Sequence, residues 1–402
     1  MTDNPAALTV VGIGADGWAG LAGTATAALA AAEVIIGSSR QLDLLPGHVR
    51  GRRVPWPSPL LPAIPGLLAA HAGRRVVVLA SGDPMFHGIG ATLRRHVADL
   101  TVIPHPSSVS LAAARLGWPL ADVETVSLVT APVEELHPLI HPGRRILVLS
   151  RDAGTPAQVA ELLVERGYGD STLTVLAQLG GPAEATISGP AQSLDLSAVD
   201  PLTVIAVECG PGGRAFPRVP GLPDDSYDSD GQLTKREVRA VTLAILGPQP
   251  GELLWDIGAG SGSIAIEWMR THPACRAVAV ESDPVRAARI AGNARALGVP
   301  KIKVVEGRAP AALTGLPAPD VIFIGGGVTR DGVLDTAWAA LPAGGRLVAN
   351  AVTLESEAVL AAWYARLGGD LTRVAVSRGA PVGGFTGWKP MMPVTIWSVT
   401  KP

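Results

Sequence analysis

The sequence predicts an α/β protein of two domains. The chain has 402 residues, and a single domain usually contains about 100–200. Short runs of β-branched residues alternate with alanine-rich stretches along both halves, which is typical of layered α/β domains. Residues 209–230 are rich in proline, glycine and aspartate, which indicates a solvated linker. We therefore expect domains at residues 1–208 and 231–402.

In the first half, the strands expected for a sheet are short and largely apolar. A strand of a parallel sheet is covered on both faces, so its apolar residues form a nearly continuous run. A helix is expected over 24–32. Runs that predict strands lie at residues 8–11, 34–36, 76–80, 100–103, 146–149 and 203–207.

The second half shows the same alternation. A helix is expected over 235–246 and a strand over 253–256. Further expected strands lie at 277–280, 302–305, 321–324, 346–349 and 394–399. Because helical stretches separate most of these strands, we expect one doubly wound sheet.

Composition narrows the classes of function. Hydrophobic residues make up 47% of the chain and charged residues 17%, which excludes a disordered protein. A net charge of -2 gives no general attraction to nucleic acid or to an anionic membrane. No run reaches the roughly 20 apolar residues that span a bilayer. Cys209 and Cys275 have neither metal-site nor disulfide spacing. We expect a cytoplasmic protein without metal, nucleic-acid or membrane partners.

The most informative motif is the glycine loop Asp256-Ile257-Gly258-Ala259-Gly260-Ser261-Gly262. It follows an expected strand and precedes a helix expected over 263–270, at the edge where open α/β sheets bind ligands. A dinucleotide fingerprint, G-x-G-x-x-G, would have its last glycine where Ser263 stands. The spacing therefore favours S-adenosylmethionine over NAD.

Three further features match the parts of that cofactor. Asp256 could hold the ammonium of the amino-acid moiety. Glu281, at the end of the next expected strand, could accept hydrogen bonds from both ribose hydroxyls. Residues 306–310 follow another expected strand and are placed to enclose an adenine. NAD binding stays a competing hypothesis with which Glu281 is compatible.

The loops of the first half are less specific. Gly12-Ile13-Gly14-Ala15-Asp16-Gly17 satisfies the dinucleotide pattern, but Glu33 precedes the next expected strand instead of ending it. Ser81-Gly82-Asp83-Pro84 directly follows the apolar run 76–80. From these loops alone, a ligand site and ligand-free tight turns remain equally open.

Residues 8–208 resemble the tetrapyrrole (class III) methylases, which implies a fold of two lobes. The features that carry the resemblance are Gly12-x-Gly14, the run Glu33-Val34-Ile35-Ile36-Gly37, the loop Ser81-Gly82-Asp83-Pro84, and Pro106-Ser107-Ser108. Ala15-Asp16 departs from the Pro-Gly of many relatives.

Residues 231–402 resemble the class I corrin-ring methyltransferases, which implies a Rossmann-like fold. The features that carry this resemblance are the segment Gly231 to Arg239, the loop Trp255 to Ser263, and Glu267.

Together the halves resemble the bifunctional precorrin-6Y methyltransferases of cobalamin biosynthesis. That resemblance implies transfer of two methyl groups to carbons 5 and 15 of a tetrapyrrole and decarboxylation of the acetate on carbon 12, giving precorrin-8x. It implies carbon 5 methylation by residues 1–208, and carbon 15 methylation with decarboxylation by residues 231–402. Each domain would bind its own S-adenosylmethionine. We also expect a homo-oligomer.

The resemblance also implies roles for individual residues. In the second half, the cofactor contacts would be Gln232, Thr234, Asp256, Gly258, Gly260, Glu281, Gly307, Arg308 and Ala309. In the first half, they would be Asp83, Met85, Ser107 and Ser108, with Gly12 and Gly14 facing the macrocycle.

A substrate with several carboxylates predicts arginines near the site. We take Arg236 and Glu237 as candidate catalytic residues, because the segment around them precedes the cofactor strand. Glu237 is equally consistent with a capping or i,i+4 contact in its helix. Arg330 and Trp388 are candidate substrate contacts.

Two other classes of function remain. A methyltransferase for RNA or another small molecule would share the glycine loop but should show a basic face. A non-catalytic scaffold that binds S-adenosylmethionine should have lost cofactor residues, which are intact here.

Overall fold

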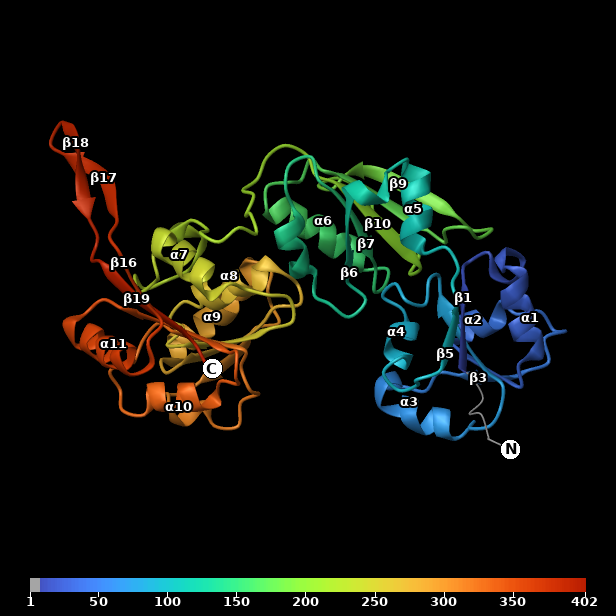
Figure 1. Cartoon of the computed structure of the whole chain (residues 1–402). Coiled ribbons are helices and arrows are strands. Elements are labelled where there is room, and N and C mark those ends of the chain that lie inside the picture. The colour runs from blue at the N-terminus through green and yellow to red at the C-terminus, as the bar shows by residue number, and fades with distance from the viewer. Residues whose placement is uncertain (1–7) are drawn as a thin grey trace. The chain divides into compact units, whose positions relative to one another are not determined.

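The computed structural model describes residues 8–402. The described chain divides into two compact units, one of residues 8–133 and 141–214 and the other of residues 134–140 and 215–402 (Figure 1). Among the described residues, no helix is both long enough and apolar enough to cross a membrane.

The first sheet of unit 1 is parallel throughout and has the strand order β3-β2-β4-β1-β5. Its strands are β1 (Leu8–Ile13), β2 (Val34–Gly37), β3 (Arg52–Pro55), β4 (Val76–Ser81) and β5 (Leu100–Ile103). Its helices are α1 (Gly23–Ala31), α2 (Ser39–Asp43), α3 (Leu60–Ala69) and α4 (Ile89–Leu93), with η1 at Gly17–Gly20. Val11 of β1 packs with α1 and α2, and Val10 packs with α3 and α4. Both faces of the strand are therefore buried, as its apolar run predicts.

The second sheet of unit 1 is mixed and has the order β6-β7-β10-β8-β9. Only the β6–β7 pair is parallel within it. Its strands are β6 (Val123–Ser127), β7 (Arg145–Leu149), β8 (Thr172–Ala177), β9 (Ala185–Pro190) and β10 (Thr203–Glu208). The helical elements of this part of unit 1 are α5 (Ser108–Leu116), α6 (Thr155–Glu165) and η2 (Leu120–Asp122). The short helix η3 (Val133–Leu139) belongs to unit 2 except for its first residue.

Unit 2 is built on one sheet with the order β13-β12-β11-β14-β15-β19-β16. Its strands are β11 (Leu253–Ile257), β12 (Arg276–Glu281), β13 (Lys303–Glu306), β14 (Val321–Ile324), β15 (Arg346–Ala351), β16 (Asp370–Val374) and β19 (Val394–Thr400). The first five are parallel, whereas β19 is antiparallel to both of its neighbours.

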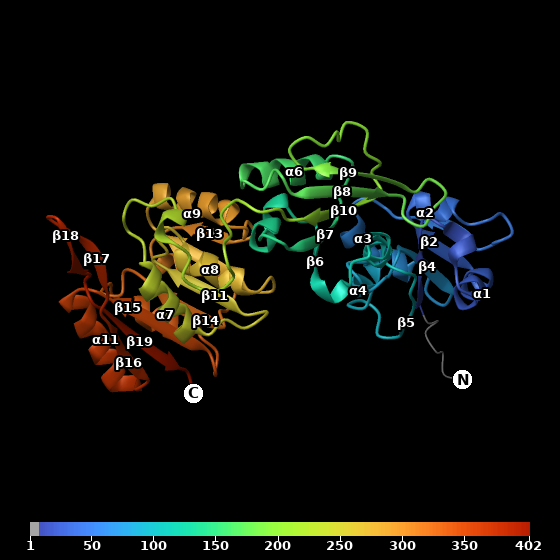
Figure 2. The ribbon, with the colours of Figure 1, turned by 90° about the horizontal axis from the view of Figure 1, so that it is seen from above.

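Helices cover both faces of this sheet (Figures 1 and 2). One face carries α7 (Arg236–Leu246), α8 (Ser263–Thr271) and α9 (Pro284–Ala296). The other carries α10 (Val333–Ala340) and α11 (Leu354–Leu367). The short helices η4 (Asp224–Ser226) and η5 (Ala311–Leu313) lie in connections. Leu254 of β11 packs into the first layer and Trp255 into the second, so the central strand is buried on both faces.

A two-stranded hairpin extends from this sheet (Figure 1). It consists of β17 (Ser377–Val382) and β18 (Phe385–Pro390), paired antiparallel. The hairpin was not predicted, because its strands contain glycine and proline, which weaken strand patterns.

The structure corrects the expectation of a solvated linker over residues 209–230. Residues 215–230 belong to unit 2, and Phe216, Leu222 and Tyr227 are buried in its core. The proline-rich composition concealed these three apolar anchors, whose burial attaches the segment to unit 2 although much of its remaining surface is exposed. Residues 215–230, although rich in proline and aspartate, therefore form part of unit 2.

Candidate cofactor site

A cavity of about 870 Å³ lies at the carboxyl edge of the unit 2 sheet, within the range of about 300–1,000 Å³ typical of ligand sites. Five stretches of chain supply most of its lining: residues 231–235, 256–261, 280–282, 307–309 and 325–327. Single residues complete it, among them Val238, Ser263, Ile264, Arg286, Arg330, Val333, Asn350, Val352, Met391, Met392 and Val394.

Gly258 allows the glycine loop to approach the end of β14 closely. Its φ is +71°, and a Cβ at this position would lie 2.8 Å from the backbone of Gly326. Its N–H donates to the carbonyl of Val280 at 3.0 Å. A larger residue would therefore force apart two loops that both line the cavity.

Two acids stand at the ends of the neighbouring strands β11 and β12. Asp256 is 1% exposed; its Oδ2 accepts from the N–H of Ala265 at 3.1 Å, and its Oδ1 has no partner among residues 8–402. Burial raises the pKa of Asp256 to about 7, and the charge of Glu281 adds to the rise. Glu281 accepts from the N–H of Gly260 at 2.8 Å and from that of Asp283 at 3.0 Å. One acid thus has a free buried acceptor, and the other fixes the glycine loop.

Unit 1 contains a smaller cavity of about 100 Å³ at the carboxyl ends of β1 and β4. Its lining includes Gly14, Arg40, Ser81, Gly82 and Ser108, together with four leucines, of which Leu176 lies in β8. The backbone is tightly packed here, since a Cβ on Gly12 would lie 2.1 Å from the carbonyl oxygen of Gly82.

Both units match known families. Residues 225–401 match the family model of the precorrin methyltransferase domain, and residues 7–195 match that of the tetrapyrrole (corrin/porphyrin) methylases. A precorrin-6Y C(5,15)-methyltransferase (decarboxylating) of Sinorhizobium sp. is 52% identical over 398 residues, covering 98% of this chain and 96% of the relative. The chain belongs to the precorrin-6Y C(5,15)-methyltransferase (decarboxylating) family.

Two more relatives of this chain are informative. A protein of the same name from Mycobacterium tuberculosis is 50% identical over 402 residues, covering 98% of this chain and all of the relative. A probable cobalt-precorrin-6B C(15)-methyltransferase (decarboxylating) of Pyrobaculum calidifontis is 34% identical over 183 residues, which cover 44% of this chain and 94% of the relative. These comparisons confirm the resemblance and the fold class predicted from the sequence.

The structure brings the expected cofactor residues of the second half together. Every one lines the large cavity: Gln232, Thr234, Asp256, Gly258, Gly260, Glu281, Gly307, Arg308 and Ala309. Arg330, expected to contact the substrate, lines it as well. Most of them lie at or just after the carboxyl ends of parallel strands, which meet at one edge of the sheet, whereas Gln232 and Thr234 come from the segment before α7.

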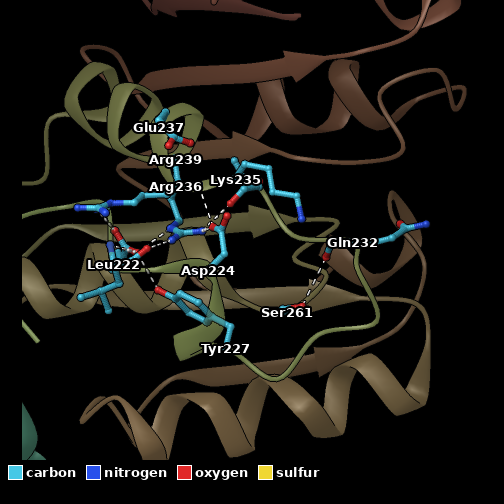
Figure 3. A network of polar contacts seen from close by, with 12 residues as sticks. Leu222, Asp224, Tyr227, Gln232, Lys235, Arg236, Glu237, Arg239 and Ser261 are labelled. Carbon is cyan, nitrogen blue, oxygen red and sulfur yellow. Dashed lines mark hydrogen bonds and ion pairs between the residues drawn. The ribbon is translucent and has the colours of Figure 1, made fainter. Parts of the chain in front are cut away.

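Three expected residues of this half lie outside the cavity lining. Arg236 begins α7 and is exposed, with its backbone N–H donating to Asp224 at 2.9 Å. Glu237 accepts from Arg378 at 2.5 Å, which lowers the pKa of Glu237. Trp388, expected in a loop, lies in β18 with 80% of its surface exposed. Figure 3 shows the side chains of Arg236 and Glu237 apart from that of Gln232.

Several lining residues were not anticipated. Lys235 adjoins residues that were, so position alone could have suggested it. Arg286 and Asn350 come from α9 and β15. Met391 and Met392 follow the hairpin, and no motif in the sequence links them to the glycine loop.

In unit 1, the expected residues are less concentrated. Gly14 and Ser108 line the small cavity, whereas Gly12, Asp83, Met85 and Ser107 do not. Ser107 caps α5, its Oγ accepting from the N–H of Ser110 at 3.0 Å. Asp83 accepts from the N–H of Met85 at 2.8 Å. The sequence did not single out the His105–Asp16 pair, whose side chains lie 3.2 Å apart beside Gly14.

Proposed function

We propose that this chain methylates carbons 5 and 15 of precorrin-6Y and decarboxylates the acetate on carbon 12, yielding precorrin-8x for cobalamin biosynthesis. The observation that carries the proposal is the similarity of 98% of the chain to proteins named precorrin-6Y C(5,15)-methyltransferase (decarboxylating). The large cavity supports it, because its lining suits the methyl donor.

The large cavity fits S-adenosylmethionine by the chemistry of its lining. The unpartnered Oδ1 of Asp256 is an acceptor for an ammonium group. Glu281 can accept from ribose hydroxyls with the lone pairs that Gly260 and Asp283 leave free. Residues 307–309 form the part of the lining that we assign to the adenine. These residues are our proposed cofactor contacts, together with Gln232 and Thr234.

The chemistry asks mainly for alignment. S-adenosylmethionine supplies an electrophilic methyl group when bound, so the protein has to hold an electron-rich ring carbon against it. Fixing reactants in near-attack geometry contributes about 7–11 kcal/mol in favourable cases. Val238 and Ile264 form a buried apolar part of the lining, which would limit the access of water to the reacting groups. Arg330 and Lys235 are placed to bind substrate carboxylates.

We assign carbon 15 methylation and decarboxylation to residues 231–402 and carbon 5 methylation to residues 1–208. The relative from Pyrobaculum calidifontis supports the assignment of carbon 15 methylation and decarboxylation to one domain. Its name includes both reactions, and its match covers only 44% of this chain. The model matched by residues 225–401, described as a precorrin methyltransferase domain, supports their place in the second half.

A second S-adenosylmethionine site is proposed at the carboxyl edge of the first sheet, with Asp83, Met85, Ser107 and Ser108 as contacts and Gly12 and Gly14 toward the macrocycle. Its small cavity of about 100 Å³ would enclose only part of a ligand of this size, since ligand sites occupy about 300–1,000 Å³. The tetrapyrrole methylase match over residues 7–195 supports the assignment.

We further propose that copies of the chain associate through the β17–β18 hairpin. Phe385 is 85% exposed and Trp388 80% exposed, and large apolar side chains on a projecting hairpin are typical of an interface. Phe385 pairs with Val382 across the hairpin, which adds to the apolar surface. Light scattering should give a multimer for the wild type and a smaller species for the double variant Phe385→Ser/Trp388→Ser. A wild-type monomer would overturn this association.

Incubation of the purified chain with precorrin-6Y and S-adenosylmethionine tests the proposed reaction. The mass of the tetrapyrrole should increase by two methyl groups and decrease by one carbon dioxide. An unchanged tetrapyrrole in the presence of bound cofactor would favour the scaffold hypothesis. Methyl transfer to RNA or to another small molecule instead would favour the other alternative.

A further inference from the structure

The wall of the large cavity formed by residues 231–235 belongs to a longer segment, residues 221–235, that lies against the glycine loop. A Cβ on Gly260 would lie 3.4 Å from the carbonyl oxygen of Gln232. The hydroxyl of Ser261 donates to the same carbonyl at 3.5 Å (Figure 3). The shape of the cavity therefore depends on where this segment is held.

Asn293 of α9 joins the segment to the glycine loop. Its Nδ2 donates to the carbonyl of Ser261 at 3.0 Å and to that of Asp228 at 2.9 Å. Its Oδ1 accepts from the N–H of Asp228 at 2.9 Å. The side chain is 4% exposed and is absent from the residues that line the cavity. One buried amide thus connects a lining loop to the segment opposite it.

Glu267 of α8 holds the other end of the segment. Its carboxylate accepts from the N–H groups of Gly221 at 2.5 Å and Leu222 at 3.0 Å, and from the hydroxyl of Tyr227 at 2.8 Å. The Nε of Arg239 donates to it at 2.6 Å. The four donors leave this buried carboxylate fully paired, which a charge in the core requires.

Arg239 connects Glu267 to the cavity wall. It is fully buried, and its guanidinium donates to the carbonyl of Thr234 at 2.5 Å and to Asp224 at 3.3 Å (Figure 3). Thr234 lines the cavity. Glu267 and Arg239 form a buried ion pair, and loss of one partner would leave an uncompensated charge that threatens the fold. Asn293 is neutral and offers the cleaner test.

We propose that Asn293 is a positioning residue for the cofactor site of unit 2. By fixing Asp228 and Ser261 relative to each other, it sets the position of the 231–235 wall and thereby the affinity for S-adenosylmethionine. It does so without contacting the cofactor. This inference rests on the proposed function only in taking the cavity to bind that cofactor.

A merely structural role would lower stability and leave cofactor affinity unchanged. Arg346 provides the matched control, because it too fixes several backbone groups of unit 2. It donates to the carbonyls of Leu246 and Gly247 at 3.0 and 3.1 Å and to Glu252 at 2.7 Å. It begins β15, so it lies at the amino edge of the sheet, opposite the cavity.

The test is equilibrium dialysis of labelled S-adenosylmethionine with the full chain, alongside thermal unfolding. For Asn293→Ala we expect one class of sites to bind about tenfold more weakly, a change that corresponds to the loss of one buried polar contact. Arg346→Ala should lower the unfolding temperature but bind as the wild type does. Equal weakening in both variants, or wild-type affinity in Asn293→Ala, would overturn the proposal.

A second variant keeps the test decisive if Asn293→Ala fails to fold. Asp230 is half-exposed, accepts from the N–H of Gln232 at 3.2 Å and pairs with Arg286 at 2.8 Å. Asp230→Ala should weaken binding about threefold, and unchanged binding would count against the proposal. A wild-type chain that binds no S-adenosylmethionine would instead contradict the proposed function.

Discussion

Asp256 and Glu281 lie at the carboxyl ends of neighbouring parallel strands, β11 and β12, and both residues line the same cavity. Their roles differ because their surroundings do. Asp256 is the more deeply buried and keeps one oxygen without a partner among the described residues, whereas Glu281 accepts backbone hydrogen bonds on both oxygens. The pair therefore combines a carboxyl that titrates near neutrality with one that holds the loop.

The first prediction concerns the pH dependence of cofactor binding. The pKa of Asp256 is about 7 in the folded chain, so this carboxyl is mostly protonated at pH 6 and mostly ionised at pH 8. An ammonium partner favours the ionised form. Affinity for S-adenosylmethionine at this site should therefore increase by roughly tenfold from pH 6 to pH 7.5. Titration calorimetry measures it, and Asp256→Asn should remove the dependence. A wild-type affinity that is flat over this interval would contradict the assignment.

The second prediction is the matching effect on stability without cofactor. The folded pKa of about 7 lies above the ordinary value of 3.8, so the folded state favours the protonated carboxyl. The contribution of Asp256 to the free energy of unfolding is fully present below about pH 3.8 and is lost as pH rises to about 7. Asp256→Asn should thus stabilise the chain at pH 8 more than at pH 5. Denaturant unfolding of the wild type and the variant at pH 5 and pH 8 measures the two differences in the free energy of unfolding. A larger stabilisation at pH 5 than at pH 8 would contradict the prediction.

The third prediction concerns Gly258. Gly258→Ala places a Cβ 2.8 Å from the backbone of Gly326 at a φ of +71°. Because two lining loops must separate, affinity for S-adenosylmethionine should decrease by at least about tenfold. Gly344 has a φ of +79° with nothing within 4 Å of an added Cβ. Gly344→Ala should therefore lower stability through backbone strain alone and leave affinity unchanged. Equal affinities in the two variants would show that the close approach at Gly258 is unimportant.

The fourth prediction separates two arginines. Arg330 lines the cavity and Arg236 does not. If Arg330 binds a substrate carboxylate, Arg330→Ala should raise the KM for the tetrapyrrole about tenfold with little change in the affinity for S-adenosylmethionine. The hypothesis from the sequence, which favours Arg236, predicts the larger effect for Arg236→Ala. Steady-state kinetics of both variants decides between the two.

Sequence patterns could predict the fold where local and global signals agree. The apolar run 76–80 and the strand expected over 253–256 correspond to β4 and β11 within one or two residues. Most of the expected cofactor residues meet because they lie at or just after the ends of parallel strands, a placement that topology dictates, but Gln232 and Thr234 follow no strand. Proline and aspartate concealed the packing of Phe216, Leu222 and Tyr227, because a few apolar anchors leave no periodic pattern.

The rest of the site depends on tertiary contacts that spacing does not encode. The sequence is compatible with both a catalytic and a structural role for Glu237. Its partner Arg378 lies 141 residues away, in a hairpin that was not predicted. Met391 reaches the cavity only because the chain returns from that hairpin. Asn293 sits within an ordinary helix pattern, where a buried bridging amide looks like any polar residue.

The central claim is that one chain performs two methylations at two separate cofactor sites, one of which depends on Asp256. Mass analysis of the tetrapyrrole formed by Asp256→Ala from precorrin-6Y and S-adenosylmethionine tests it most directly. We predict a product with one added methyl group and with its acetate carboxyl retained. Loss of both methylations in a variant that is still folded would contradict the claim.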